Sequence, residues 1–304
     1  MEYVLSCNAL CKSYRRFQAL DHLSMHVPKG SIYGFVGKNG AGKTTLIRLI
    51  CGLQAPSSGE YQLYGHSHND GQIALARRQM GAVVETPSIY GHLSATENLK
   101  EQYRVLGIPE TNTIPALLDL VGLGDTGKKK AKNFSLGMRQ RLGIAIALAG
   151  SPDFLVLDEP INGLDPQGII EVRELILKLN REHHITVLIS SHILDELSKL
   201  ATHYGFIDHG RMIKEISAPA LEASCRKCVV VEVSDIRALC RVLDKTNFEY
   251  CVQNDNTADI YSKVNITKLV MALAEENCEI LSVKERDESL ESYYVNLVGG
   301  ESHA

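Results

Sequence analysis

One segment of eight residues has the spacing of a phosphate-binding loop and carries the groups that such a loop needs. Its residues are Gly37, Lys38, Asn39, Gly40, Ala41, Gly42, Lys43 and Thr44. They match the pattern G-x-x-x-x-G-K-[ST], in which glycines let backbone N–H groups turn inward around phosphate oxygens. Lys43 would neutralise phosphate charge, and the hydroxyl of Thr44 would help to hold Mg²⁺. The pattern predicts a nucleotide phosphate site.

The elements on either side of this loop are those that the site requires. Residues 31–36 form a β-branched and aromatic run, which is typical of a buried strand. From Thr44 and Thr45 to Ile50 the residues predict a helix that stops at Gly52. The start of that helix would add its positive dipole end to the phosphate site. An ordinary glycine-rich turn is the alternative, and the order strand, loop, helix argues against it.

Two further apolar segments end in residues suited to ATP hydrolysis. Residues 154–157 predict a strand leading to Asp158, which would bind Mg²⁺ through the outer coordination shell, and Glu159, which would polarise the attacking water. Residues 185–189 predict a strand before His192, whose neutral ring could donate a hydrogen bond to the γ-phosphate. Two acids can also enter a surface turn, and a lone histidine is usually structural. Because parallel sheets place ligands at the carboxyl ends of their strands, we interpret all three residues as functional.

Length, charge and cysteine usage restrict the class of protein. The chain has 304 residues, enough for one large or two modest domains, and a formal net charge of −4. This balance does not favour a nucleic-acid surface. No apolar stretch reaches the roughly 18 residues of a membrane span, and the first residues lack a signal-peptide pattern. The eight cysteines are scattered, which favours reduced thiols. We expect a soluble cytoplasmic protein without a nucleic-acid partner.

A capped helix lies between the two halves of the site and completes a family pattern. Ser135 is the predicted N-cap, and by itself this segment is no more than a capped core helix. The phosphate loop, residues 135–141, residues 158–160, residues 162–165 and His192 follow one another at the spacing of one family. The set resembles the nucleotide-binding subunit of an ABC transporter over about residues 3–217.

The resemblance implies a role for further residues. Tyr14 lies where the family stacks an aromatic ring on adenine, and Ser135 and Gly137 lie in the signature that contacts the γ-phosphate bound to the other subunit of a dimer. Asp165 belongs to the loop that links the two sites, and His192 is the switch histidine. The implied partners are ATP with Mg²⁺, a second ATPase subunit in a homodimer or heterodimer, and a separately encoded membrane permease. The chain would then lie on the inner face of the plasma membrane through that permease.

Two departures from the family pattern carry information. The signature usually reads Leu-Ser-Gly-Gly-Gln, whereas residues 134–138 read Phe-Ser-Leu-Gly-Met. The family places a glutamine that reaches Mg²⁺ and water where this chain has Glu85, whose carboxylate can still coordinate a hard cation. Residues 81–90, 93–99 and 289–300 resemble the bacitracin and lantibiotic resistance branch. That likeness implies handling of antimicrobial peptides or drugs.

The expected fold class is an α/β P-loop ATPase domain of ABC type with a helical subdomain, followed by a small α+β domain. We expect the ATPase domain over residues 1–217 and its helical subdomain over about 86–150, with residues 85–92 facing the membrane subunit. After residue 218 the pattern reads β-α-β-β-α-β, which is typical of a ferredoxin-like domain over 218–304. That domain is regulatory, supports the dimer or only packs.

The sequence therefore predicts an ATP-binding and ATP-hydrolysing subunit that powers export or removal of a substrate through a separate membrane subunit. One alternative is a soluble ABC ATPase that acts on the ribosome or DNA. Such proteins commonly carry two cassettes, coiled-coil insertions or basic surfaces, and this chain has one cassette and an acidic balance. A second alternative is a nucleotide-sensing module with low turnover, which Glu85 in place of the usual glutamine suggests.

Overall fold

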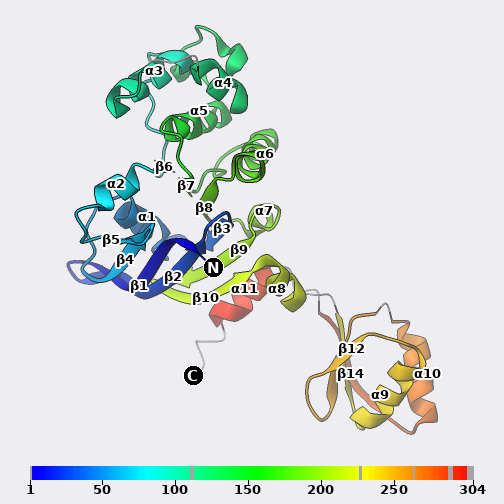
Figure 1. Cartoon of the computed structure of the whole chain (residues 1–304). Coiled ribbons are helices and arrows are strands. Elements are labelled where there is room, and N and C mark those ends of the chain that lie inside the picture. Colours follow the sequence, from blue (N-terminus) through cyan, green and yellow to red (C-terminus); the bar gives the residue numbers. More distant parts are fainter. Residues whose placement is uncertain (1, 110–112, 226–227, 263, 287–289, 300–304) are drawn as a thin grey trace. The chain divides into compact units, whose positions relative to one another are not determined.

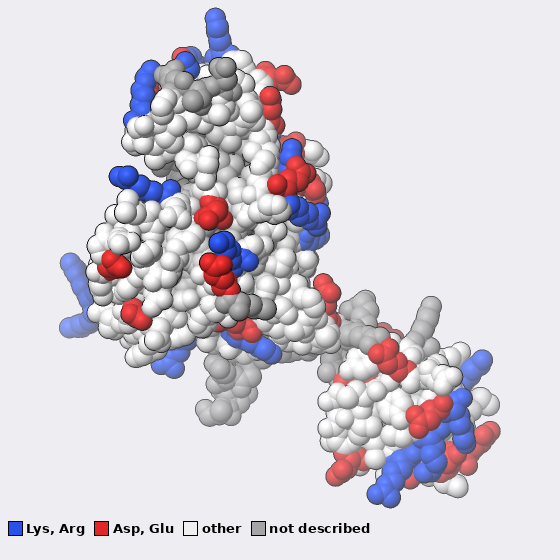
Figure 2. Space-filling model, in the orientation of Figure 1, with Lys and Arg blue, Asp and Glu red and all other residues white. Residues whose placement is uncertain are grey.

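The computed structural model describes residues 2–109, 113–225, 228–262, 264–286 and 290–299 (Figure 1). The contacts divide the chain into two compact units, Met1–Ala218 and Pro219–Ala304. Among the helices of the described ranges, none is long and apolar enough to cross a membrane. All eight cysteines lie in these ranges, and no disulfide joins any two of them. On the face drawn in Figure 2, basic and acidic side chains of the described residues are interspersed.

A largely parallel sheet of six strands forms the centre of the first unit. Its order is β10-β9-β3-β8-β7-β6, and only the β9–β10 pair is antiparallel. Strands β3, β7 and β8 are buried along their whole length, as expected for continuous apolar runs in a sheet covered on both faces. The strands are β3 Ile32–Val36, β6 Met80–Val83, β7 Phe154–Asp158, β8 Thr186–Ser191, β9 His203–Asp208 and β10 Arg211–Ser217.

Strands β3, β7 and β8, which precede the predicted site residues, are each followed by a helix. The helices are α1 Lys43–Ile50 after β3, α6 Pro166–His183 after β7 and α7 Leu194–Ser198 after β8. Asp165 caps α6, since its side chain accepts a hydrogen bond from the N–H of Gly168 at 3.1 Å. The loops between strand and helix therefore all lie at the carboxyl edge of the sheet, where the sequence predicts the site.

An antiparallel sheet lies beside the central one and shares its core. Its order is β2-β1-β4-β5, and the elements are β1 Tyr3–Tyr14, β2 Phe17–Pro28, β4 Ser58–Leu63 and β5 His66–Ser67, followed by α2 Ile73–Arg77. Side chains such as Leu5, Met25, Leu46 and Phe35 belong to one buried cluster that joins this sheet, α1 and the central sheet. This shared core holds the first strands against the phosphate loop.

The helices between β6 and β7 form a separate layer of the first unit. They are α3 Ala95–Leu106, α4 Thr113–Leu120 and α5 Leu136–Leu148, with short 3₁₀ turns at Gly124–Thr126 and Ala131–Asn133. In Figure 1 these helices lie together, on the far side of β6 from the antiparallel sheet. Ser94 begins α3 with a capping box to Glu97, and Ser135 begins α5 by accepting a hydrogen bond from Met138. The expected N-cap at Ser135 is therefore confirmed.

The second unit contains an antiparallel sheet whose core is shared with helices α9 and α10. Helix α8 Ala218–Ser224 leads into it, and the following elements are β11 Cys228–Val233, α9 Ile236–Lys245, β12 Tyr250–Val252, β13 Thr257–Ile260, α10 Ile266–Glu275, β14 Ile280–Arg286 and α11 Leu290–Gly299. The strand order is β12-β13-β11-β14, and every pair is antiparallel. Buried side chains of α9 and α10, including Leu239 and Leu273, form its core with Val231 and Ile260.

Candidate nucleotide-binding site

The phosphate loop joins β3 to α1, and strands β2 and β9 pack closely against it. Gly42 is the N-cap of α1 with a φ of 110°, and a Cβ added there would lie 2.6 Å from the carbonyl oxygen of Ala19. A Cβ at Gly37 would lie 2.6 Å from the carbonyl oxygen of Ile207. Glycine is required at both positions because the neighbouring strands β2 and β9 leave no room for a side chain. Lys38, Asn39 and Gly40 at the tip are exposed.

Lys43 lies under this loop with its ammonium group enclosed. The side chain is 5% exposed, and Nζ donates to the carbonyl oxygens of Gly37 at 2.5 Å and Lys38 at 3.2 Å. The same nitrogen lies 3.2 Å from Oε1 of Glu159. The ammonium group is held by two carbonyl oxygens and one carboxylate, the kind of contacts that a phosphate could replace. Thr44 and Thr45 follow, both half-buried.

Asp158 and Glu159 follow one another at the end of β7 but lie in different surroundings. Asp158 is 1% exposed, and its Oδ1 accepts a hydrogen bond of 2.6 Å from the hydroxyl of Ser190. Oδ2 of Asp158 is buried without a hydrogen-bond partner. A buried carboxylate oxygen is costly without a partner, so this atom fits a bound cation or a water of its coordination shell. The donor set of Asp158 and the half-buried Thr44 is the oxygen chemistry that Mg²⁺ prefers.

Glu159 lies at the centre of the charged groups. Its backbone adopts a φ of 49°, and its N–H donates to the hydroxyl of Ser190 at 2.9 Å. Its carboxylate contacts Lys43 through Oε1, and Oε2 lies 2.8 Å from Nδ1 of His192. The left-handed backbone turns the side chain away from the strand direction and toward both partners. The carboxylate that follows β7 therefore connects the first residue of α1, which comes after β3, with the residue that follows β8.

Strand order explains why these residues meet. β8 lies between β3 and β7, with Val36 opposite Ser191 and Ser190 opposite Asp158. The ends of the three strands are therefore in register at one edge of the sheet. Ser190 and its role in joining Asp158 to Glu159 were missed from the sequence, although a polar pair ending an apolar strand is a signal for it.

Other expected site residues lie at separate places of the first unit. Tyr14 ends β1, half-exposed, where its hydroxyl donates to Gln54 and Nζ of Lys12 lies 5.2 Å from the ring centroid. Ser135 and Gly137 begin α5, where a Cβ at Gly137 would lie 3.6 Å from the Cα of Gly168. Among the described contacts, none joins these residues to the Lys43–Glu159–His192 group.

Glu85 also lies apart from that group. It follows β6 with a φ of 59°, and its Oε1 contacts Nη2 of Arg48 on α1. The sequence offers no signal for this pairing beyond the opposite charges. The partner of Glu85 in this structure is thus a cationic side chain, and a role of Glu85 as a metal ligand stays a prediction.

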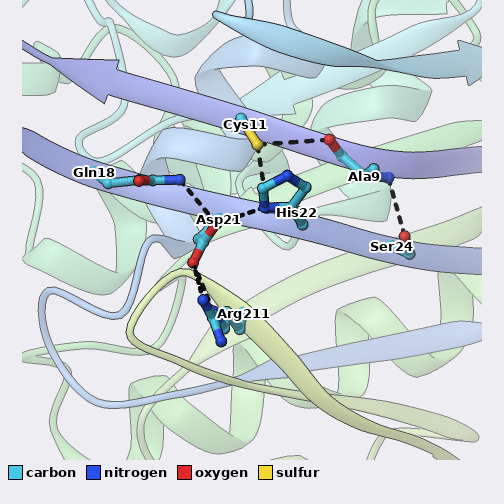
Figure 3. A network of polar contacts seen from close by, with 7 residues as sticks. All are labelled: Ala9, Cys11, Gln18, Asp21, His22, Ser24 and Arg211. Atoms are coloured by element: carbon cyan, nitrogen blue, oxygen red, sulfur yellow. Dashed lines mark hydrogen bonds and ion pairs between the residues drawn. The ribbon is translucent and has the colours of Figure 1, made fainter.

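A polar network joins β1, β2 and the start of β10 (Figure 3). Asp21 accepts hydrogen bonds from Gln18 at 2.8 Å and from Arg211 at 2.6 Å, and lies 2.6 Å from Nδ1 of His22. The bond from His22, followed by that from Arg211, lowers the pKa of the Asp21 carboxyl. Ligand atoms of Cys11, Asp21 and His22 lie within 4.8 Å of one another. Because Asp21 is already neutralised and fully bonded, we interpret the cluster as structural.

The backbone beside this network reaches the phosphate loop directly. The N–H of Asp21 donates to the carbonyl oxygen of Gly210 at 2.9 Å, and the N–H of Gly210 donates to that of Ala41 at 3.0 Å. The ion pair of Asp21 with Arg211 joins β2 to β10, next to the turn whose Gly210 is hydrogen-bonded to the phosphate loop. The geometry as a whole is that of a P-loop domain of the α/β class, in which a lysine, two acids and a histidine lie at the carboxyl edge of the central sheet.

Comparison with known proteins identifies the family. The profile of the family described as ABC transporter matches residues 20–162. The bacitracin transport ATP-binding protein BcrA of Bacillus licheniformis is 41% identical over 304 residues, covering 99% of each chain. The lantibiotic transport ATP-binding protein SrtF of Streptococcus pyogenes is 44% identical over 212 residues, covering 70% of this chain and 90% of SrtF.

The solved structures agree with this assignment. The ADP conformation of MJ1267, an ATP-binding cassette of an ABC transporter, matches with a TM-score of 0.64 and 26% identity, covering 71% of this chain and 92% of that one. The chain belongs to the ATP-binding proteins of ABC transporters, which are the ATPases of these systems. Its homologues include bacitracin and lantibiotic transport proteins.

Proposed function

We propose that the phosphate loop with Lys43, Thr44 and Thr45 binds the phosphates of ATP, with Mg²⁺ held by Thr44, by Asp158 through its shell and by Glu85. The observation that carries this proposal is the single carboxylate of Glu159 in contact with both Lys43 and His192. Mg²⁺ would neutralise charge on the β- and γ-phosphates. The buried oxygen of Asp158 without a partner supports a cation beside the loop.

The residues around the γ-phosphate position have chemistry suited to hydrolysis. Entry of the phosphate chain draws Lys43 to its oxygens, which releases the Glu159 carboxylate from that ion pair. Glu159 then orients and polarises the water that attacks phosphorus, giving ADP and inorganic phosphate. His192, already within 2.8 Å of Glu159, donates a hydrogen bond to the γ-phosphate as charge develops. The three residues come from the segments that follow β3, β7 and β8, so the central sheet would preorganise the group.

The signature residues act on a second subunit in this proposal. Ser135 and Gly137 start α5, and its N-terminal end would face the γ-phosphate of ATP bound to another copy or a related chain. Asp165 at the start of α6 links the two sites, and Tyr14 stacks on adenine. The solved dimeric cassette MJ0796 shares the fold of this subunit, with a TM-score of 0.63 and 23% identity. That a sandwich of two subunits forms here is part of the proposal.

The proposed transporter also contains a membrane permease. Residues 85–92 join the central sheet to the helical layer, and a cavity of about 400 Å³ opens beside Glu85, Pro87 and Ser88. A segment of a separately encoded permease would contact this region, which places the chain on the cytoplasmic face of the plasma membrane. The homology to BcrA and SrtF supports bacitracin or a lantibiotic as the class of transported substrate.

The two units correspond to an ATPase domain over residues 1–217 and an accessory domain over 218–304 in this proposal. The strand order β12-β13-β11-β14 with antiparallel pairing throughout supports a ferredoxin-like accessory domain. We assign it a regulatory or dimer-supporting role. The interspersed charges in Figure 2 do not favour action on the ribosome or DNA.

ATP hydrolysis by the purified chain, compared with Glu159→Gln, tests the proposal. Removing the carboxylate charge should lower turnover by at least about 100-fold while ATP still binds, so the variant should accumulate as an ATP-bound dimer. Size-exclusion chromatography with Mg-ATP measures the dimer, and Glu101→Gln on the exposed face of α3 is the control. A chain that neither dimerises nor hydrolyses ATP, even with its co-expressed permease, would refute the proposal.

A further inference from the structure

The contact between Glu85 and Arg48 joins two elements that matter for nucleotide binding. Arg48 lies in the last turn of α1, the helix that begins at Lys43, and Glu85 begins the connection from β6 to the helical layer. Nη2 of Arg48 contacts Oε1 of Glu85. The side chains are 35% and 55% exposed, and both line the cavity beside residues 82–88. The connection is thus bonded to the helix that carries the phosphate loop.

The pairing compensates for the charge that Glu85 brings. A neutral glutamine at this position would add no charge near the phosphates, whereas a carboxylate adds one negative charge and would repel the phosphate chain. With Arg48 in contact, the net charge of the Arg48–Glu85 pair is zero, whereas Arg48 beside a glutamine would leave a net charge of +1. Glu85 also has a left-handed backbone conformation, with a φ of 59°. An ion pair to α1 would help to stabilise this conformation.

We propose that Arg48 is a positioning residue for ATP binding: it neutralises Glu85 and holds its carboxylate beside α1. This inference rests on the proposed function, in which Glu85 lies beside Mg-ATP. Arg48 acts through Glu85 and contacts no nucleotide. Its contribution therefore depends on which residue occupies position 85. A basic residue in the last turn also complements the helix dipole, but that effect is independent of residue 85.

A double-mutant cycle separates these two roles. The four proteins are the wild type, Arg48→Ala, Glu85→Gln and the double variant, and the readout is the Kd for a fluorescent ATP analogue with Mg²⁺. Loss of Arg48 should weaken binding by about fivefold when Glu85 is present, and by less than about twofold when glutamine replaces it. The fivefold effect should shrink between about 0.05 M and 0.5 M salt, because the charges are partly exposed.

Two further variants and a measurement of folding serve as controls. Arg48→Lys supplies a point charge without the planar fork and should recover part of the affinity. Arg104→Ala removes an exposed arginine that pairs with Glu101 on α3 and should bind as the wild type does. Thermal unfolding of every variant shows which remain folded, and Kd values are compared for those.

The outcomes distinguish this inference from the proposed function. Equal weakening by Arg48→Ala in both backgrounds, with the wild type binding Mg-ATP, would overturn the role of Arg48 and leave the proposed site standing. Binding of Mg-ATP by none of the four folded proteins would overturn the proposed site, and the role of Arg48 with it. A loss confined to the background with Glu85 supports both.

Discussion

Nζ of Lys43 and Oε1 of Glu159 lie 3.2 Å apart, so the lysine of the phosphate loop is bound to the acid that we propose as the polarising group. The groups around Nζ of Lys43 are the carboxylate of Glu159 and two backbone carbonyl oxygens. A phosphate chain would replace these contacts with stronger charge-assisted ones. The proposed function therefore predicts that occupation of the phosphate loop changes the partners of Glu159.

Replacement of Lys43 by methionine should remove ATP binding rather than folding. The buried ammonium has no substitute in the site, so affinity for Mg-ATP should fall at least about tenfold and turnover should be lost. Isothermal titration with ATP and Mg²⁺ measures the first effect, and circular dichroism checks the fold. Lys29→Met, which removes an exposed lysine paired with Glu2, should leave both unchanged. Retained affinity in Lys43→Met would contradict the phosphate role.

Replacement of Ser190 by alanine should reduce both stability and turnover. The fully buried hydroxyl donates to Asp158 and accepts from the N–H of Glu159. Its loss leaves Oδ1 of Asp158 without this donor, and the N–H of Glu159 with only the backbone carbonyl oxygen of residue 190 at 3.2 Å. The free energy of unfolding in urea should fall by about 1–3 kcal/mol. Ser191→Ala is the matched control, since Ser191 is equally buried but accepts from the N–H of Ile193. If both variants lost turnover equally, the link from Ser190 to Asp158 would not matter for catalysis.

Two glycines of the phosphate loop should respond differently to alanine. Gly42 has a φ of 110° and would bring its Cβ 2.6 Å from a backbone oxygen, whereas Gly40 has a φ of 83° and no atom within 4 Å of its Cβ position. Gly42→Ala should destabilise the nucleotide-free protein by more than about 3 kcal/mol, because strain and a clash add. Gly40→Ala should cost about 1 kcal/mol from backbone strain alone. Urea unfolding compares them, and equal costs would contradict the close approach of β2.

The cap of α3 should make stability depend on pH. The N–H of Ser94, followed by the ammonium group of Lys130, lowers the pKa of Glu97 to about 2 from an ordinary 4.5. Because the folded pKa is depressed, the stabilisation is complete above about 4.5 and is lost as the pH falls toward 2. The stability difference between the wild type and Glu97→Gln should therefore be constant near neutral pH and narrow below about 4.5.

Urea unfolding at a series of pH values measures this difference. Glu101→Gln, on the same helix, replaces a carboxylate that pairs with Arg104 at the exposed surface and serves as the comparison. A difference that widened on acidification would mean that Glu97 does not bind Ser94 and Lys130 as its carboxylate.

Local sequence determined the parts of this protein whose chemistry depends on neighbouring residues. The phosphate loop from Gly37 to Thr44 could be predicted because one turn of backbone, its glycines and the following helix are contiguous. The cap at Ser135 and the apolar strands before Asp158 and His192 could be predicted for the same reason. Strand order, by contrast, depends on which long-range pairings bury the most apolar surface.

Only the tertiary structure decided which of these residues meet. β8 lies between β3 and β7, so Lys43, Glu159 and His192 converge although more than a hundred residues separate the first two. The same packing gave Ser190 its two partners and placed Arg48 against Glu85, and no local pattern encodes either contact. The sequence by itself determined which chemical groups this ATPase carries. The register of three parallel strands decided which of these groups contact one another.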